Sequence, residues 1–439
     1  MDKSYPLGED LGRALSPLCP LPTSPLKGEA TLRMDKSYPL GEDLGGALSP
    51  FSFLILYLLY IMHIQTKPHF ALLDGLRGVA ALAVLWYHVN EGFAFAEATN
   101  GAGDGIIRSF NHGYLAVDFF FILSGFVIAY AYDDRWSKGL TIGNFFKRRL
   151  IRLHPMLIAG AIIGAITFLI QGGVTWSGEA VSTSAVLLCL ALTFLFIPSV
   201  PGGSYEVRGN GEMFPLNGPF WSLFFEYIGN ILYALLLRRL STKALAILVA
   251  LLGITFFWFA TCNISGYGSI GVGWTLDALN FLGGSLRMLF PFSLGMLLAR
   301  TFRPRPVRGA FWLCTAMLLA LFAVPYIEMM QPLCMNGVFE MTCIMLIFPA
   351  IVLLAASSIS VSTTTKRTAT FLGDLSYPLY TVHYPLMYLF YAGLIANEQY
   401  NFTSVPWQSL GVMAGSILVA FVLMKWYDVP VRKWLSSKF

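Results

Sequence analysis

Long apolar segments restrict this sequence more than any other feature. They recur over most of its length, at 73–90, 114–132, 153–170, 184–199, 220–237, 244–261, 282–299, 309–327, 340–357, 372–395 and 408–427. A helix needs about 20 apolar residues to cross the hydrocarbon core of a bilayer. The chain is 56% hydrophobic and only 12% charged, whereas soluble domains carry about 25% charged residues. We therefore exclude a water-soluble fold and predict an all-α, polytopic transmembrane helix bundle.

Basic residues between these segments predict the topology, because positively charged loops stay on the cytoplasmic side. The basic groups are Lys147, Arg148, Arg149 and Arg152; Arg238, Arg239 and Lys243; Arg300, Arg303, Arg305 and Arg308; Lys366 and Arg367; and Arg432, Lys433 and Lys438. All of these basic groups lie on the cytoplasmic side of the membrane only if the two apolar segments between Arg152 and Trp221 cross it once in total. We therefore expect one of these two segments to be re-entrant or interfacial. We predict about ten spanning helices, cytoplasmic termini, and the external loops 91–113, 200–219 and 262–281.

The N-terminal part differs in character from the rest of the chain. Residues 1–17 recur almost unchanged at 34–50, joined by a proline-rich stretch. Two copies are too few to stack into a solenoid, and the linker composition is typical of disorder. We predict that 1–61 is a disordered or mis-assigned extension and that 62–439 is the membrane domain.

Charge and cysteine patterns exclude two further classes of function. The net charge is +5, and the basic residues lie between the apolar segments. This distribution fits cytoplasmic loops better than a nucleic-acid surface. The six cysteines lack the spacing of metal ligands, and packing explains them. We expect no nucleic-acid partner and no metal site.

An ionisable residue inside a predicted span costs about 2.5–3.5 kcal/mol and therefore often marks function, and four such residues stand out by their position. In the predicted topology all four fall in the outer half of the membrane: His88, Asp118, Glu226 and His383. Glu226 also shares a polar stripe with Ser222 and Asn230. We expect His88 to be a catalytic base that Glu226 or Asp118 orients.

Each of these residues also has a purely structural interpretation. His88 follows Trp86 and Tyr87, so it fits an interfacial aromatic belt. Asp118 fits a helix cap. His383 lies between Tyr380 and Tyr384, where packing is at least as good an explanation as catalysis. A buried carboxylate such as Glu226 is harder to dismiss, because without a partner it would neutralise.

Ordered motifs along the chain resemble those of the acyltransferase 3 family of bacterial multi-pass membrane proteins. They are LDGLRGVAALAVLWYHV at 73–89, YLAVDFFFILSGFVIAY at 114–130, FFKRRLIRLHP at 145–155, WSLFFEY at 221–227 and LGDLSYPLYTVHYPL at 372–386. The resemblance runs from about Ala71 to Trp434. Departures are small: the family usually has Glu at the position of Asp428, and often an aromatic residue at that of His154.

The resemblance implies transfer of an acyl group, commonly acetyl from acetyl-CoA, to hydroxyls of envelope glycans or small exported compounds. It also implies roles for Arg77, His88, Arg149 and Arg152. Arg149 and Arg152 are spaced i, i+3 and present two guanidinium groups on one helix face, which suits phosphate. Arg77 lies eleven residues before His88, about 16 Å along the same helix face. The pantetheine arm of acyl-CoA is then expected to run from the cytoplasmic arginines toward His88, in the bacterial inner membrane.

A different class of function is a proton-coupled transporter of a small anionic or sugar compound, in which His and Glu relay protons and the arginines bind the anion. The sequence shows no inverted repeat of its helix pattern, and the order of the motifs favours the enzyme. A flippase that moves acyl groups without choosing the acceptor differs only in the last step. Aromatic residues in external loops, such as Trp176 and Tyr205, offer rings for sugars, but interfacial anchoring explains them equally well.

Overall fold

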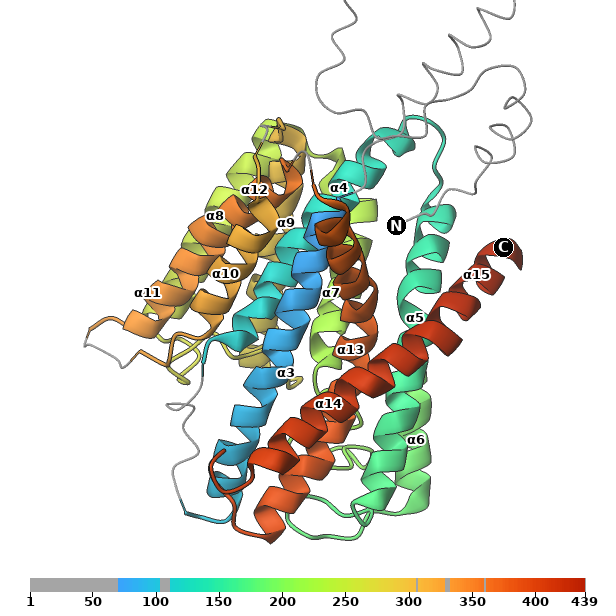
Figure 1. Cartoon of the computed structure of the whole chain (residues 1–439), viewed down its shortest axis with the longest axis vertical. Coiled ribbons are helices and arrows are strands. Elements are labelled where there is room, and N and C mark those ends of the chain that lie inside the picture. The colour runs from blue at the N-terminus through green and yellow to red at the C-terminus, as the bar shows by residue number, and fades with distance from the viewer. Residues whose placement is uncertain (1–69, 103–110, 305–306, 328–331, 359–360, 439) are drawn as a thin grey trace, which may run out of the picture. The chain divides into compact units, whose positions relative to one another are not determined.

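The described part of the chain folds as an all-helical bundle (Figure 1). The computed structural model describes residues 70–102, 111–304, 307–327, 332–358 and 361–438. The predicted extension 1–61 lies outside the described residues, as do the first residues of the predicted membrane domain.

The described residues form seventeen helices and helical turns, most of which match an apolar segment of the sequence. They are α3 (Ala71–Thr99), η2 (Gly113–Leu115), α4 (Ala116–Trp136), α5 (Ile142–Ile170), α6 (Thr183–Phe194), α7 (Phe220–Leu235), η3 (Leu237–Arg239), α8 (Thr242–Thr261), α9 (Ala278–Thr301), α10 (Ala310–Phe322), α11 (Met335–Thr342), η4 (Cys343–Ile347), α12 (Phe348–Ala356), α13 (Thr363–Ala396), α14 (Pro406–Leu423), η5 (Met424–Asp428) and α15 (Val429–Lys438). Side-chain oxygens of Thr141, Ser182, Ser241 and Ser362 cap α5, α6, α8 and α13, and each accepts a hydrogen bond from a backbone N–H that the first turn leaves free.

Eight helical segments of the described residues are long and apolar enough to cross a membrane, so the predicted number of about ten is not confirmed. Helix α6 has 12 residues, about 18 Å of helix, and is too short for a core about 30 Å thick. Helix α10 has 13 residues and is also shorter than the predicted span 309–327. Helix α13 is 34 residues long but is not one of the eight, because its five tyrosines, two prolines and single histidine lower its hydropathy.

Helices α3 and α13 form the most extensive helix pair of the bundle and lie side by side in Figure 1. Their backbones approach closely at Gly78, where a Cβ atom would overlap the carbonyl group of Leu372. Helices α4 and α9 meet in the same way at Gly125, whose missing Cβ leaves room for the Phe292 carbonyl. Small residues permit such close packing where lipid offers no hydrophobic driving force between helices. The first of these pairs carries most of the candidate site.

Proline interrupts α13 at Pro378 and Pro385, on either side of His383. A proline has no N–H, so Pro385 leaves the carbonyl group of Thr381 without its helical partner. The Nδ2 atom of Asn217 donates to this carbonyl at 2.7 Å. The loop before α7 therefore supplies the hydrogen bond that the Thr381 carbonyl loses at the proline. Backbone groups inside a membrane protein need such a partner, because lipid offers none.

Candidate active site

His88 lies on α3, one turn before Glu91, and its Nδ1 atom is 2.6 Å from Glu91 Oε2. An ionised carboxylate only accepts hydrogen bonds, so Nδ1 carries the proton and Nε2 keeps a free lone pair. Among the described residues Nε2 makes no hydrogen bond, and it is not one of the fully buried polar atoms. A histidine that a carboxylate orients in this way is suited to act as a general base.

Two tyrosines of α13 hold the carboxylate of this pair. The hydroxyl of Tyr391 lies 2.9 Å from Glu91 Oε2 and 2.7 Å from the carbonyl oxygen of His88. The hydroxyl of Tyr384 lies 3.3 Å from Glu91 Oε2, and its ring stands edge-on to the His88 ring at 4.7 Å. Helix α13 thus fixes the position of Glu91, which in turn fixes the His88 ring.

His383 lies beside His88, with 5.2 Å between the ring centroids. Its Nδ1 atom is 3.0 Å from the carbonyl oxygen of Leu379, so Nδ1 is the donor and Nε2 is unprotonated in the neutral ring. The side chain is 1% exposed, and its Nε2 atom is buried without a hydrogen-bond partner. The structure therefore brings His383 to the predicted base, and its catalytic role stays a prediction.

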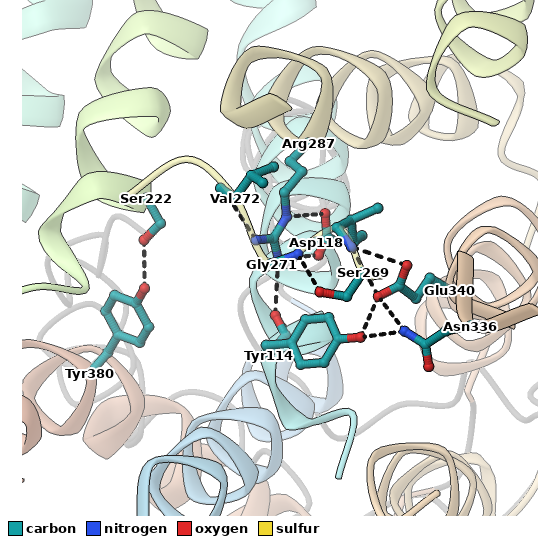
Figure 2. A network of polar contacts seen from close by, with 11 residues as sticks. Tyr114, Asp118, Ser222, Ser269, Gly271, Val272, Arg287, Asn336, Glu340 and Tyr380 are labelled. Carbon is teal, nitrogen blue, oxygen red and sulfur yellow. Dashed lines mark hydrogen bonds and ion pairs between the residues drawn. The ribbon is translucent and has the colours of Figure 1, made fainter. Parts of the chain in front are cut away.

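Asp118 does not orient His88, contrary to our expectation from the sequence. Its carboxylate binds Arg287 of α9 through two contacts, Oδ2 to Nη2 at 2.7 Å and Oδ1 to Nε at 3.2 Å. Arg287 also donates to the carbonyl oxygens of Val272 and Tyr114, at 3.2 and 3.1 Å (Figure 2). Asp118 and Arg287 are both buried, so this ion pair joins α4, α9 and the loop before α9.

Glu226 also pairs with an arginine rather than with His88. Its Oε1 atom lies 2.8 Å from Nη2 of Arg149 and accepts a hydrogen bond from the Ser124 hydroxyl at 3.1 Å. Glu226 lies on α7 and Arg149 lies on α5. The expected carboxylate partner of His88 is therefore replaced by Glu91, and Glu226 belongs with the arginines.

The three arginines predicted to bind the donor gather around this pair. Arg77 forms an ion pair with Asp74, one turn earlier on α3, at 3.1 Å. Arg77, Arg149, Arg152 and Glu226 lie close enough to act on one another's charge. Within the part of the chain that the structure describes, Arg152 has neither an ion pair nor a side-chain hydrogen bond. Asp428, which forms an ion pair with Arg432 at 2.6 Å, also lies close enough to interact with the charge of Arg152. Of the three predicted donor ligands, Arg152 is therefore the one without an ion pair in the described structure.

Polar side chains connect this arginine cluster to His88. Ser222 lies one turn before Glu226 on α7, and its hydroxyl is 2.5 Å from that of Tyr380 (Figure 2). The Tyr380 ring lies 5.9 Å from the ring of His383, which contacts His88. The predicted polar stripe of α7 therefore continues on α13 and ends at the candidate base.

Sequence reasoning missed several members of this site. Glu91 follows His88 at the i, i+3 spacing that lets helix side chains touch, so the spacing itself was an available signal. Arg287 is a charge inside an apolar segment, which should have marked it as a partner for a buried carboxylate. Nothing local distinguishes Tyr384 and Tyr391 from the other tyrosines, because their contacts depend on the packing of α3 against α13.

No group of three or more His, Cys, Asp or Glu residues that could hold a metal ion was found among the described residues.

The chain is similar to several known proteins. A family model described as an acyltransferase domain matches residues 70–425. Acyltransferase MdmB of Streptomyces mycarofaciens is 28% identical over 391 residues, which cover 83% of this chain and 92% of that protein. Peptidoglycan O-acetyltransferase OatA of Listeria monocytogenes is 24% identical over 385 residues, which cover 82% of this chain and 55% of that protein. Protein 2 in the picA locus of Rhizobium radiobacter is 32% identical over 194 residues, 42% of this chain and 92% of its own length. No solved structure matches the chain.

Proposed function

Because the chain belongs to the acyltransferase 3 family of multi-pass membrane enzymes, we propose that it is an O-acyltransferase that uses acyl-CoA. The acyl group, acetyl in our proposal, moves to a hydroxyl of an envelope glycan or another exported acceptor. The observation that carries the proposal is the His88 to Glu91 contact of 2.6 Å, because it provides the base that a hydroxyl acceptor needs. The relative named as a peptidoglycan O-acetyltransferase supports a glycan acceptor.

In the proposed reaction, Nε2 of His88 removes the proton from the acceptor hydroxyl as the oxygen attacks the thioester carbonyl. Glu91 stabilises the imidazolium that forms, because its carboxylate holds the Nδ1 proton. The carbon–sulfur bond then breaks, and the thiolate of coenzyme A takes the proton from His88. The products are an ester and a free thiol, whether the acyl group passes directly or through an acylated intermediate.

The donor would enter from the cytoplasmic side, where its phosphates meet the arginine cluster. Arg152, which has no ion pair in the described structure, offers a free guanidinium group, and Arg149 is held in place by Glu226 at 2.8 Å. Planar guanidinium groups bind phosphate oxygens in pairs. The pantetheine arm would then follow Ser222, Tyr380 and His383 toward His88. Acyl-CoA is a substrate in this proposal and not a permanently bound cofactor.

This proposal places the protein in a bacterial inner membrane, with both termini in the cytoplasm. Coenzyme A is made and kept in the cytoplasm, so the arginine cluster must face that side. The acceptor would reach His88 from the outer side. The predicted external loops at 200–219 and 262–281 lie at that end of the proposed path.

The experiment that tests the function compares ester-linked acyl groups on envelope glycans. A strain that lacks the protein is complemented with wild type, with His88→Ala or with the matched control His154→Phe. His154 is a suitable control because its Nδ1 atom lies 3.4 Å from the Tyr227 hydroxyl, and none of the hydrogen bonds or ring contacts of the described residues joins it to His88 or Glu91. We expect the wild type and the control to restore the same esters, and His88→Ala to restore none. Equal ester content in the deleted and complemented strains would reject the proposed function.

A further inference from the structure

Among the described residues, two arginines are almost fully buried, Arg208 with 0% and Arg287 with 2% of its surface exposed. They differ in their partners. Arg287 binds the carboxylate of Asp118 through two nitrogens. Within the described part of the chain, no carboxylate lies within ion-pairing distance of Arg208. A buried charge without an opposite charge is costly, so Arg208 lacks the compensation that Arg287 has.

The guanidinium group of Arg208 is nevertheless held firmly. Its Nε atom donates to the carbonyl oxygen of Pro215 at 2.6 Å, and Nη1 donates to Gln171 Oε1 at 2.8 Å. Its central carbon lies 3.4 Å from the centroid of the Tyr388 ring. The third nitrogen, Nη2, is buried and has no hydrogen-bond partner. One donor of a fixed cation is thus left free.

Two further polar atoms beside Arg208 are also buried and unpartnered, Nε1 of Trp176 and Oδ1 of Asn210. The Trp176 ring lies 5.2 Å from the guanidinium carbon and 5.9 Å from the Tyr388 ring. The backbone N–H of Trp176 donates to the carbonyl oxygen of Arg208 at 3.0 Å, which ties the two loops together. Buried polar groups normally have partners, so the unpartnered atoms of Arg208 and of the Trp176 ring beside it indicate a site for a polar ligand.

This cluster is continuous with the candidate active site. The ring of Tyr388 contacts that of Tyr384 at 4.6 Å, and Tyr384 contacts His88 at 4.7 Å. The Trp176 ring lies 5.0 Å from Phe95, one turn after Glu91 on α3. A molecule bound at Arg208 would therefore lie next to the residues that surround the candidate base. Along α13, Tyr377 lies near Arg152, His383 contacts His88 and Tyr388 contacts Arg208, so Arg208 and the predicted donor cluster lie on opposite sides of His88.

We propose that Arg208 binds an anionic group, a carboxylate or a phosphate, that the hydroxyl-bearing acceptor carries. This proposal rests on the proposed function for the identity of the ligand as the acceptor. The free Nη2 donor and the unpaired charge recognise the anion, and the Trp176 ring offers a surface for an adjacent sugar ring. Neutral sugars would lack the charge that compensates Arg208.

Glu212 makes binding of an anion depend on pH. It is buried beside the site, accepts a hydrogen bond from the Tyr388 hydroxyl, and is influenced by the charges of Arg208 and Glu206 and by the Asn210 side chain. Burial raises the pKa of Glu212 to about 7. Below that pH Glu212 is neutral and Arg208 attracts an anion alone. Above it the carboxylate is charged, neutralises Arg208 and repels the ligand, so affinity for an anion falls as pH rises.

The test measures binding by calorimetry with the purified full chain and without any acyl donor. The probes are glucuronate, glucose 6-phosphate and neutral glucose. We expect at least one anionic sugar to bind at about pH 6 about tenfold or more tightly than glucose, and the stronger of the two identifies carboxylate or phosphate as the group recognised. Raising the pH to about 8 should weaken that binding, and Glu212→Gln should remove the pH dependence.

Arg208→Gln should weaken binding of the anion about tenfold or more, whereas Arg135→Gln, at an exposed arginine, should not. Any anion binding that remains in Arg208→Gln belongs to the predicted donor arginines. Two results would overturn the proposal: glucose binding the wild type as tightly as both anions, or Arg208→Gln binding them as tightly as wild type. The comparison of glucose with the anions uses wild-type protein alone, so it tests the proposal even if a variant does not fold. Binding that passes these tests without acyl transfer would count against the proposed function alone.

Discussion

At the scale of single residues, Glu91 decides which nitrogen of His88 is available as the base. Replacing Glu91 by Gln keeps the size of the side chain and removes its charge. The imidazolium that forms during the reaction then loses its stabilisation, and the Nδ1 proton loses a firm acceptor. We expect kcat to fall by about tenfold or more, with little change in the acyl-CoA concentration needed for half-maximal rate.

Glu97→Gln is the matched control for this prediction, since Glu97 lies on the same helix beyond the site. Kinetics of both variants at saturating acetyl-CoA would check it. A wild-type kcat in Glu91→Gln would mean that His88 does not depend on this carboxylate.

Arg149 and Arg152 could bind the phosphates of the donor or serve only as a positive charge that sets the topology. Substitution by lysine distinguishes these two roles. Lysine preserves the cytoplasmic positive charge, so expression and orientation should not change. It cannot reproduce the planar fork that binds two phosphate oxygens. The double substitution to Lys should therefore raise the acyl-CoA concentration needed for half-maximal rate, and leave the dependence on acceptor unchanged. The double change Arg238→Lys and Arg239→Lys, in another basic group predicted to be cytoplasmic, controls for general effects. Unchanged acyl-CoA binding would show that the pair serves topology alone.

At the scale of helices, the close packing of α3 and α13 positions the site. A side chain at Gly78 would collide with the backbone of Leu372. Gly78→Leu should push the helices apart, destabilise the fold by about 1–3 kcal/mol and separate Tyr391 from Glu91. The midpoint of thermal unfolding and the transfer rate should both fall. Gly411→Leu on α14 should change neither, because a Cβ atom there meets open space.

Predictions at the helix scale succeeded where they depended on composition and failed where they depended on contacts. The apolar segments correctly predicted an all-helical bundle, and the polar stripe of α7 is present. The predicted span 309–327 became the shorter helix α10, because apolar composition continues beyond the point where the helix ends. The charge of Arg287 inside an apolar segment signalled a need for a carboxylate partner, but the sequence could not assign Arg287 to Asp118 or Arg149 to Glu226, because the members of each pair are far apart in the chain. Only the geometry of the packed bundle brings these charges together.

At the scale of the whole molecule, the Asp118 and Arg287 pair joins α4, α9 and the loop before α9. Arg287→Leu would leave a buried carboxylate unpaired and should lower the free energy of unfolding by about 3–5 kcal/mol. Removing Asp118 as well, by Asp118→Leu, should recover much of that loss. Thermal or denaturant unfolding of both single variants and the double variant would measure the coupling. Additive effects would mean that the two charges do not stabilise each other.

The central claim is that His88 takes the proton of the acceptor during acyl transfer. The most direct measurement uses purified protein in vesicles, labelled acetyl-CoA, and envelope glycans extracted from a strain that lacks the protein. We predict that wild type and His154→Phe transfer the label to the glycan, and that His88→Ala transfers none above background while it remains folded and inserted. Transfer by His88→Ala at the wild-type rate would contradict the account.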